Sequence, residues 1–145
     1  MKRIKELMTR PVSVGEPTST LAEIAEIMRE EDTGAVPICE NGKAVGMITD
    51  RDIVMRTLAQ DVDPSQVLAQ DVMSTPVIYC YDDEDVDIAA QVMEDKQIRR
   101  LVVLNTQGEL VGVVSLGDLA AKSGDIPLVG QIVEKITEPS HHPRI

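Results

Sequence analysis

Val45-Gly46-Met47-Ile48-Thr49-Asp50-Arg51-Asp52 is the stretch that decides the fold, because it returns later as Val111-Gly112-Val113-Val114-Ser115-Leu116-Gly117-Asp118. An earlier stretch also recurs, since Met8-Thr9-Arg10-Pro11-Val12 returns as Met73-Ser74-Thr75-Pro76-Val77. Self-similarity at a nearly fixed period identifies the building block of a fold. Two copies are too few for a solenoid, and they suit a pseudo-symmetric pair in which each copy buries the apolar face of the other.

The composition predicts one compact unit with an aliphatic core. The chain has 145 residues, 43% of them hydrophobic, with no Phe and no Trp, and this length is enough to bury a core of Val, Ile, Leu, Ala and Met. No apolar run approaches the length that crosses a bilayer, and the first residues lack the apolar stretch of a signal peptide. Two well-separated cysteines, Cys39 and Cys80, are typical of a reducing compartment. We therefore expect a cytoplasmic protein with no membrane partner.

Charge and histidine placement narrow the function classes further. The formal net charge is −11, and a chain this acidic is repelled by phosphate backbones, so we expect no nucleic-acid partner. Both histidines, His141 and His142, lie in a proline-flanked tail, which argues against histidine-dependent catalysis and histidine zinc sites. Carboxylate-dependent catalysis stays open as a minor alternative, as does a divalent ion at the acidic run 82–85, which more simply caps the following helix. We predict no catalytic residue and no metal.

Apolar spacing and turn residues predict the same β-α-β-β-α order in each copy. In the first copy we expect a short helix at 4–8, a strand at 12–14, a helix capped by Thr18 or Ser19, a hairpin of strands 35–39 and 44–48 around Asn41-Gly42, and a helix at 49–60. The second copy repeats this with strands at 77–79, 101–104 and 110–114 and helices at 84–96 and from Ser115. The expected domains are repeats at 1–62 and 63–124, a C-terminal helix within 125–138 and a disordered tail at 139–145.

The pattern Gly-x-x-[Thr/Ser]-x-x-Asp occupies the junction of the last strand and last helix of each copy. One interpretation is local, because a hydroxyl with an acid three residues later resembles a helix capping box. The other is functional, because hydroxyl and carboxylate then project together at a strand end, where a carboxylate can accept hydrogen bonds from a ribose diol. The sequence alone leaves both interpretations open.

Taken together, the doubled β-α-β-β-α order, the Met-x-x-Pro-Val opening and the Gly-x-x-[Thr/Ser]-x-x-Asp close resemble a tandem pair of cystathionine beta-synthase (CBS) domains, or Bateman module. The resemblance covers residues 1 to about 124, and we expect a stand-alone pair without a catalytic domain. It implies an α+β fold of two pseudo-symmetric repeats packed sheet to sheet. It also implies binding of adenine nucleotides (AMP, ADP, ATP, sometimes NAD or S-adenosylmethionine) in clefts between the copies, and a homodimer.

Carried onto this chain, the resemblance implies two unequal clefts. The main cleft would be lined by Thr49, Arg51, Asp52, Val77, Ile78, Ile98, Arg99 and Arg100. The second, weaker cleft would be lined by Val12, Ser13, Thr33, Gly34, Ala35, Ser115 and Asp118. Members of the family often carry basic residues at the start of the second strand, and only the second copy keeps them, as Arg99-Arg100 where the first copy has Gly34-Ala35. Because a phosphate needs local cations on so acidic a chain, we expect one strong nucleotide per chain.

The sequence thus predicts a non-catalytic regulatory protein that senses an adenine nucleotide. The alternative is a structural or dimerisation module whose ligand clefts are vestigial. Apolar stripes on three helices (residues 21–28, 86–93 and 128–136) favour a homodimer, with the C-terminal helix contributing. Which nucleotide is physiological, and which protein partner is regulated, stay open.

Overall fold

The computed structural model describes residues 2–10 and 13–138, which form two compact units. One unit, here the first-copy unit, comprises residues 13–77. The other, the second-copy unit, combines residues 2–10 with residues 78–138. Both units mix helices and strands, so the expected α+β class with two repeats and a C-terminal helix is confirmed. The expected disorder of residues 139–145 lies outside the described residues.

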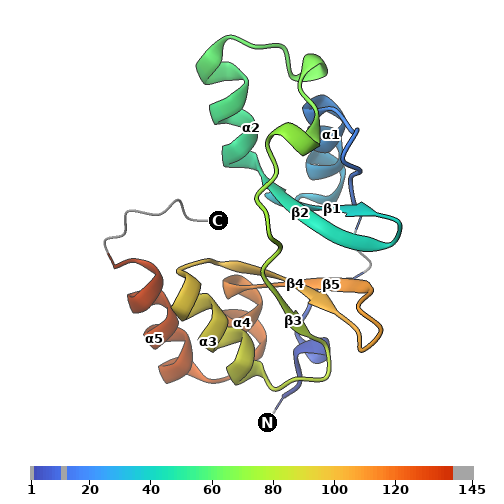
Figure 1. Cartoon of the computed structure of the whole chain (residues 1–145). Coiled ribbons are helices and arrows are strands. Elements are labelled where there is room, and N and C mark those ends of the chain that lie inside the picture. The colour runs from blue at the N-terminus through green and yellow to red at the C-terminus, as the bar shows by residue number, and fades with distance from the viewer. Residues whose placement is uncertain (1, 11–12, 139–145) are drawn as a thin grey trace. The chain divides into compact units, whose positions relative to one another are not determined.

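The first-copy unit is a hairpin with two helices on it (Figure 1). It contains α1 (Leu21–Glu31), β1 (Ala35–Glu40), β2 (Lys43–Thr49) and α2 (Asp50–Arg56), followed by 3-10 turns at Leu58–Gln60, Pro64–Gln66 and Ala69–Asp71. Strands β1 and β2 pair antiparallel, and the turn between them places Asn41 and Gly42 at φ values of 53° and 80°. Two successive left-handed residues are what a tight hairpin of this twist requires. The expected hairpin is confirmed.

Three local expectations in this unit need correction. The strand expected at 12–14 is reduced to one parallel bridge between Gly15 and Ile38, and Ser13 and Val14 form no strand; Val12 is outside the described residues. Helix α1 is capped by Thr20, not by Thr18 or Ser19, because Glu23 stands three residues after Thr20 and completes its capping box. Helix α2 ends at Arg56, before the expected residue 60, and a 3-10 turn follows.

The second-copy unit is a three-stranded sheet covered by three helices (Figure 1). Its elements are β3 (Tyr79–Tyr81), α3 (Val86–Lys96), β4 (Arg100–Leu104), β5 (Leu110–Ser115), α4 (Leu116–Lys122) and α5 (Ile126–Ile136). The strand order is β3-β4-β5, with β3 parallel and β5 antiparallel to β4. This crossover from β3 through α3 to β4 is a β-α-β unit of the expected type.

The segment that precedes the first repeat packs in the second-copy unit, and the segment that precedes the second repeat packs in the first-copy unit. Ile4 of the 3-10 turn Ile4–Glu6, together with Leu7 and Met8, is buried in the core of the second-copy unit. Correspondingly, residues 67–73 pack on the first-copy core through Val67, Ala69, Val72 and Met73. We call residues 2–10 and 67–73 the leader segments. The compact units therefore exchange leaders, and they divide the chain differently from the repeats that we read from the sequence.

The leaders explain the glycine of the repeated motif. A Cβ at Gly46 would stand 2.5 Å from Met73 Sδ, and a Cβ at Gly112 would stand 2.7 Å from Met8 Sδ and 3.0 Å from the Thr9 carbonyl oxygen. Backbone hydrogen bonds run alongside, from Ser74 to Met47 and from Thr9 to Val113, each pair at 2.9 and 3.3 Å. Only glycine leaves room for a leader at this distance.

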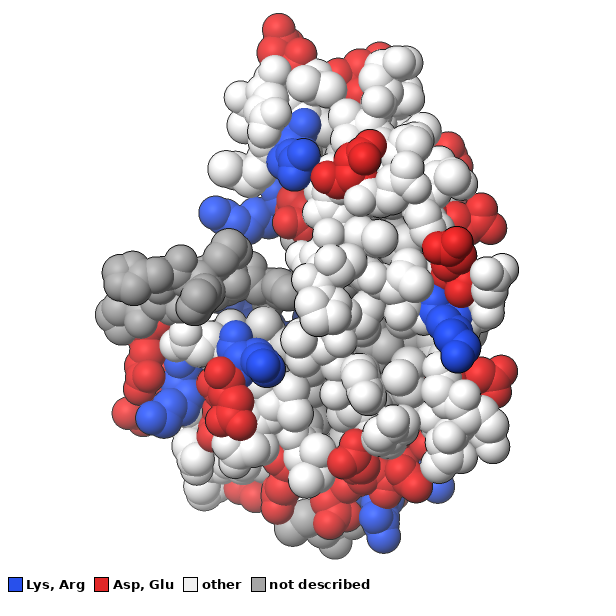
Figure 2. All heavy atoms as spheres, in the orientation of Figure 1, with Lys and Arg blue, Asp and Glu red and all other residues white. Residues whose placement is uncertain are grey.

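The acidic run 82–85 serves the first leader more than its own helix. Asp85 is the N-cap residue of α3, but its side chain makes no capping hydrogen bond; it lies 3.4 Å from the Arg3 guanidinium instead. The carbonyls of Asp82 and Glu84 accept from the backbone of Lys5 and Ile4. Figure 2 shows acidic side chains gathered over this loop between β3 and α3. The expected capping by a side chain of this run is therefore wrong at Asp85, whose carboxylate faces Arg3 of the leader instead.

The apolar stripes that we expected to form a dimer surface are largely used inside the units. The buried residues of α1 (Leu21, Ile24, Met28) and of α3 (Val86, Ala89, Ala90, Met93) belong to the two cores. Exposed apolar side chains gather elsewhere, at the end of α2 and the turn after it. We call Val54, Met55, Leu58 and Val62 the α2 patch; Leu58 in it is 79% exposed. None of the helices in the described residues is long and apolar enough to cross a membrane.

Candidate functional site

Each repeat presents a hydroxyl and a carboxylate at the junction of a strand and a helix. Thr49, at the end of β2, accepts from the backbone N–H of Asp52 at 3.2 Å, and the Thr49 N–H donates to Asp52 Oδ2 at 2.9 Å. Ser115, at the end of β5, makes the same pair with Asp118 at 3.0 and 2.9 Å. Both capping boxes are therefore formed, and the local interpretation of the motif is confirmed.

The capping role uses only one oxygen of each carboxylate, so the local interpretation does not exclude the functional one. Asp52 Oδ1 accepts no hydrogen bond from any residue that the structure describes, whereas Asp118 Oδ1 lies 3.3 Å from Lys122 Nζ. An ionised carboxylate oxygen without a partner is a strong acceptor for a ligand hydroxyl. The first copy thus offers an open acceptor and the second copy an occupied one.

Strands β1 and β4 each start beside the capping box of their own repeat. Ala35 is paired with Thr49 in the β1–β2 register, and the Asp50 N–H donates to the Gly34 carbonyl at 2.9 Å. Arg100 is likewise paired with Ser115, and the Leu116 N–H donates to the Arg99 carbonyl at 2.8 Å. Within its own unit, Asp52 therefore neighbours the start of β1, and Asp118 neighbours the start of β4.

The residues expected for the main cleft come from both units. Thr49, Arg51, Asp52 and Val77 belong to the first-copy unit, and Ile78, Ile98, Arg99 and Arg100 belong to the second-copy unit. Of the second cleft, Ser13, Thr33, Gly34 and Ala35 belong to the first-copy unit, Ser115 and Asp118 belong to the second, and Val12 is outside the described residues. The grouping of these residues into two clefts stays a prediction.

Several of these side chains are already engaged. Ile98 is buried in the second-copy core, and Ile78 packs against that core. Ser13 donates to Glu31 at 2.8 Å, and Thr33 donates to the Ala35 carbonyl at 3.2 Å. These groups shape a surface more than they offer a free donor or acceptor.

The arginines are different, because no residue in the described part of the chain pairs with their guanidinium groups. Arg51 and Arg99 are exposed and Arg100 is half-buried, and the side chains of all three form no ion pair or hydrogen bond among residues 2–10 and 13–138. On a chain with 25 acidic and 14 basic residues, unpaired guanidinium groups are groups to which a phosphate can bind without displacing an acid.

Sequence reasoning missed the lysine that closes the second acceptor. Lys122 stands four residues after Asp118 on α4, a spacing at which opposite charges meet on a helix. That signal was visible, but Arg56 stands at the same distance from Asp52 and points elsewhere, donating to the Asp71 carbonyl at 3.4 Å. Spacing alone therefore does not predict the difference.

The thiols carry no sign of reactivity. Cys80 is 2% exposed, and burial, with a smaller contribution from the Glu84 charge, raises its pKa to about 12. Burial also raises the pKa of Cys39. Thiols in such surroundings are structural. In the described residues no cluster of three or more His, Cys, Asp or Glu side chains is placed to hold a metal ion.

Comparison with known proteins identifies the family of both repeats. The model of the CBS domain matches residues 4–58 and 69–125. The chain belongs to the CBS domain family. Both matches contain the whole Gly-x-x-[Thr/Ser]-x-x-Asp motif of their copy.

Relatives of similar length exist in bacteria, and a longer one exists in an archaeon. The CBS domain-containing protein YhcV of Bacillus subtilis is 37% identical over 98% of this chain and 100% of its own length. The uncharacterized protein MK0525 of Methanopyrus kandleri is 41% identical over 80% of this chain, which spans 60% of that relative.

Solved structures of CBS proteins share the fold. The Hypoxic Response Protein I structure, with two coordinated zinc ions, has a TM-score of 0.74 and 34% identity over 83% of this chain and 98% of that one. PAE2072 of Pyrobaculum aerophilum, complexed with AMP, has a TM-score of 0.76 and 29% identity over 92% of this chain and 99% of that one. The CBS domain pair of MJ0100, in complex with 5′-methylthioadenosine and S-adenosyl-L-methionine, has a TM-score of 0.74 and 27% identity over 85% of this chain and 96% of that one.

Proposed function

We propose that this chain is a non-catalytic regulatory protein of the cytoplasm that binds an adenine nucleotide through Asp52. The observation that carries the proposal is Asp52 Oδ1, which accepts no hydrogen bond from the described residues, while Oδ2 is held at the helix start by the Thr49 N–H. A carboxylate fixed in this way is preorganised to accept hydrogen bonds from a ribose diol, so little ordering cost remains when the ligand arrives.

Two further observations support a nucleotide over a neutral ligand. Arg99 and Arg100 are unpaired in the described part of the chain and follow one another at the start of β4. Side chains alternate along a strand, so one of the two is available to a phosphate on each face. In addition, structures of related proteins contain AMP, 5′-methylthioadenosine or S-adenosyl-L-methionine, all of which carry an adenosine with its ribose diol.

The regulatory part of the proposal follows from thermodynamic linkage. A nucleotide shifts a conformational equilibrium only by its difference in affinity for the two conformations. Because the chain consists of two units, we propose that their relative arrangement is the variable that the nucleotide biases and that a protein partner reads.

A thermal-shift panel tests the function class. We expect AMP, ADP, ATP, NAD or S-adenosylmethionine to raise the melting temperature, since a ligand at 100 times its dissociation constant adds about 2.7 kcal/mol of stability. Inosine monophosphate and ribose 5-phosphate are matched controls that keep phosphate and ribose but change or remove the adenine. No stabilisation by any adenine compound at millimolar concentration would contradict the proposal and favour a structural module with vestigial clefts. Mass spectrometry of ligand that co-purifies would name the nucleotide.

A further inference from the structure

Lys122, the last residue of α4, joins the second-copy acceptor to the first leader. Its Nζ lies 3.3 Å from Asp118 Oδ1 and donates to the Leu7 carbonyl at 3.1 Å. Its own carbonyl accepts from Lys2 Nζ at 2.7 Å. Building on the proposed function, we infer that Lys122 is an internal competitor for the ribose position at Asp118, so that this acceptor is closed in the free protein.

The first copy provides a matched comparison within the same chain. Arg56 occupies the position on α2 that Lys122 occupies on α4, and it too bonds a leader carbonyl, that of Asp71 at 3.4 Å. Arg56 makes no ion pair with Asp52. Both helices therefore end in a cation that anchors a leader, but only the second copy also uses that cation to occupy the acid.

The closure at Asp118 is shallow enough for a ligand to reverse. The Asp118 side chain is 15% exposed, whereas the Lys122 side chain is 45% exposed, so the lysine ammonium reaches water as soon as it leaves the carboxylate. A pair whose lysine is in contact with water adds little stability. A ribose that displaces Lys122 consequently loses roughly a three- to fivefold factor in affinity relative to an open acceptor.

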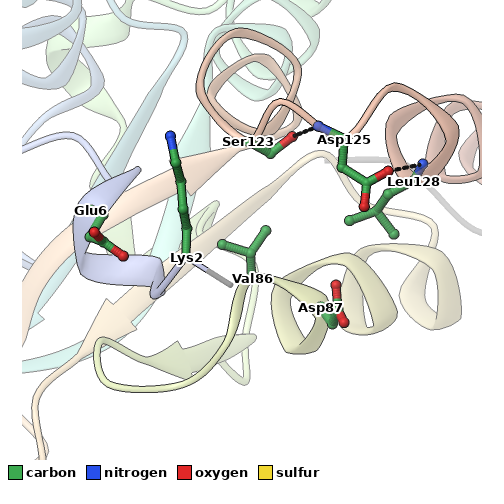
Figure 3. Close-up of a pocket in the computed structure, with 7 residues that line it drawn as sticks. All are labelled: Lys2, Glu6, Val86, Asp87, Ser123, Asp125 and Leu128. Atoms are coloured by element: carbon green, nitrogen blue, oxygen red, sulfur yellow. Dashed lines mark hydrogen bonds between the residues drawn. The ribbon is translucent and has the colours of Figure 1, made fainter.

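A pocket lies next to the end of α4, beside the residue that follows Lys122. It has a volume of about 440 Å³ and is lined by Lys2, Glu6, Val86, Asp87, Ser123, Asp125 and Leu128. Figure 3 shows Glu6 and Lys2 on the leader, and Ser123 directly after α4, around this space. This pocket therefore borders the end of α4 and the leader whose Leu7 carbonyl accepts from Lys122.

Titration with adenosine in an Asp52→Asn background isolates the second acceptor. Adenosine carries no phosphate, so the loss of a positive charge at residue 122 does not remove a phosphate contact. We expect Lys122→Gln to tighten adenosine binding roughly three- to fivefold, and we expect the added change Asp118→Asn to abolish that gain. Arg56→Gln is the matched control and should leave the adenosine affinity in this background unchanged.

The outcomes separate this inference from the function on which it rests. Adenosine affinity that is unchanged or weaker in Lys122→Gln, or a gain that survives Asp118→Asn, would overturn the inference. If Asp52→Asn alone weakens AMP binding while Lys122→Gln has no effect, the proposed function stands and only the closure by Lys122 falls. If neither the unchanged chain nor any variant binds adenosine or AMP, the proposed function and the inference about Lys122 are both wrong.

Discussion

At the scale of single residues, the two motif carboxylates have the same capping geometry and different free oxygens. Asp52 and Asp118 each accept from the backbone N–H of their own N-cap residue, Thr49 or Ser115, at 2.9 Å, so their capping contributions to stability should match. Asp118 differs only in its contact with Lys122. Function and stability can therefore be separated by comparing the same substitution at the two positions.

Asp118→Asn and Asp52→Asn should lower stability by similar amounts, because each weakens one cap, worth about 1 kcal/mol. Only Asp52→Asn should strongly weaken AMP binding. Urea unfolding and an AMP titration of both variants check this pair of expectations. Equal losses of AMP affinity in the two variants would show that the acceptors are equivalent and that Lys122 closes nothing.

Cys80 should be inert to thiol reagents at pH 8 while the chain is folded. Its pKa is raised to about 12 by burial, so almost no thiolate is present at pH 8. Labelling with iodoacetamide, followed by mass spectrometry, should modify Cys80 only after denaturant is added. The raised pKa also makes the stability of the fold depend on pH, because the folded chain favours the neutral thiol. The thiol therefore contributes fully to the free energy of unfolding below about pH 8.5, and this contribution is lost as the pH rises toward 12. Rapid labelling of the native protein would contradict the burial of this side chain.

At the scale of elements, the leaders determine which residue the motif can begin with. Gly112→Ala would place a Cβ 3.0 Å from a backbone oxygen of Thr9, which cannot move aside, whereas at Gly46 the atoms in the way belong to the Met73 side chain. We expect both changes to destabilise the chain by about 1–3 kcal/mol.

Shortening the methionine distinguishes the two sites. Met73→Gly should rescue much of the Gly46→Ala loss, because it removes the Sδ, Cγ and Cβ atoms that stand at 2.5, 2.7 and 2.9 Å. Met8→Gly should rescue Gly112→Ala less well, since the Thr9 carbonyl oxygen remains at 3.0 Å. Double-mutant cycles in urea give the coupling energies. Equal rescue at both glycines would show that the backbone contact at Gly112 is not limiting.

Local elements were predictable where the deciding residues lie close together in the chain. The caps at Thr49 and Ser115 and the hairpin at Asn41-Gly42 depend on spacings of one to three residues, and all three formed. The N-cap of α1 was also decided locally, but the choice between Thr18 and Ser19 overlooked Glu23, which selects Thr20. The exchange of leaders was not predictable, because no periodicity or turn signal links Met8 to Gly112.

The candidate site was predictable to the same extent. The motif acids and the arginine pair were visible as residue types at fixed spacing, but their partners were not. Whether Asp52 or Asp118 keeps a free oxygen depends on the rotamer of a lysine or an arginine one helical turn away, and both spacings are identical. Both cations also bond a leader carbonyl, that of Asp71 or Leu7, so only the full packing shows which acid is occupied.

At the scale of the whole molecule, the α2 patch is the surface that we propose for a homodimer. Val54, Met55 and Leu58 are exposed side by side along α2 and the following turn, and apolar residues that remain outside both cores favour contact with a second copy. We expect a homodimer at micromolar concentration, and Leu58→Glu should weaken it at least tenfold because association would then bury a charge.

Ile88→Glu is a control for the dimer, because Ile88 is an exposed apolar residue on α3 and does not belong to the α2 patch. Light scattering over a concentration series gives the mass of each variant. A mass near 15.8 kDa for the unchanged chain throughout that range would rule out the homodimer. A dimer that Leu58→Glu leaves intact would place the interface elsewhere, for example on α5, where Ile126 is 83% exposed.

The most direct test of the central claim is calorimetric titration of AMP into three proteins: the unchanged chain, Asp52→Asn and Asp50→Asn. Asp50 is a neighbouring exposed acid whose carboxylate, among the described residues, accepts a hydrogen bond only from the adjacent Arg51 N–H, so its variant removes the same charge from the same helix start. The proposed function predicts one strong site per chain, a loss of roughly 30- to 150-fold in affinity for Asp52→Asn from the charged hydrogen bonds, and little change for Asp50→Asn. Equal AMP affinity in all three proteins would contradict it.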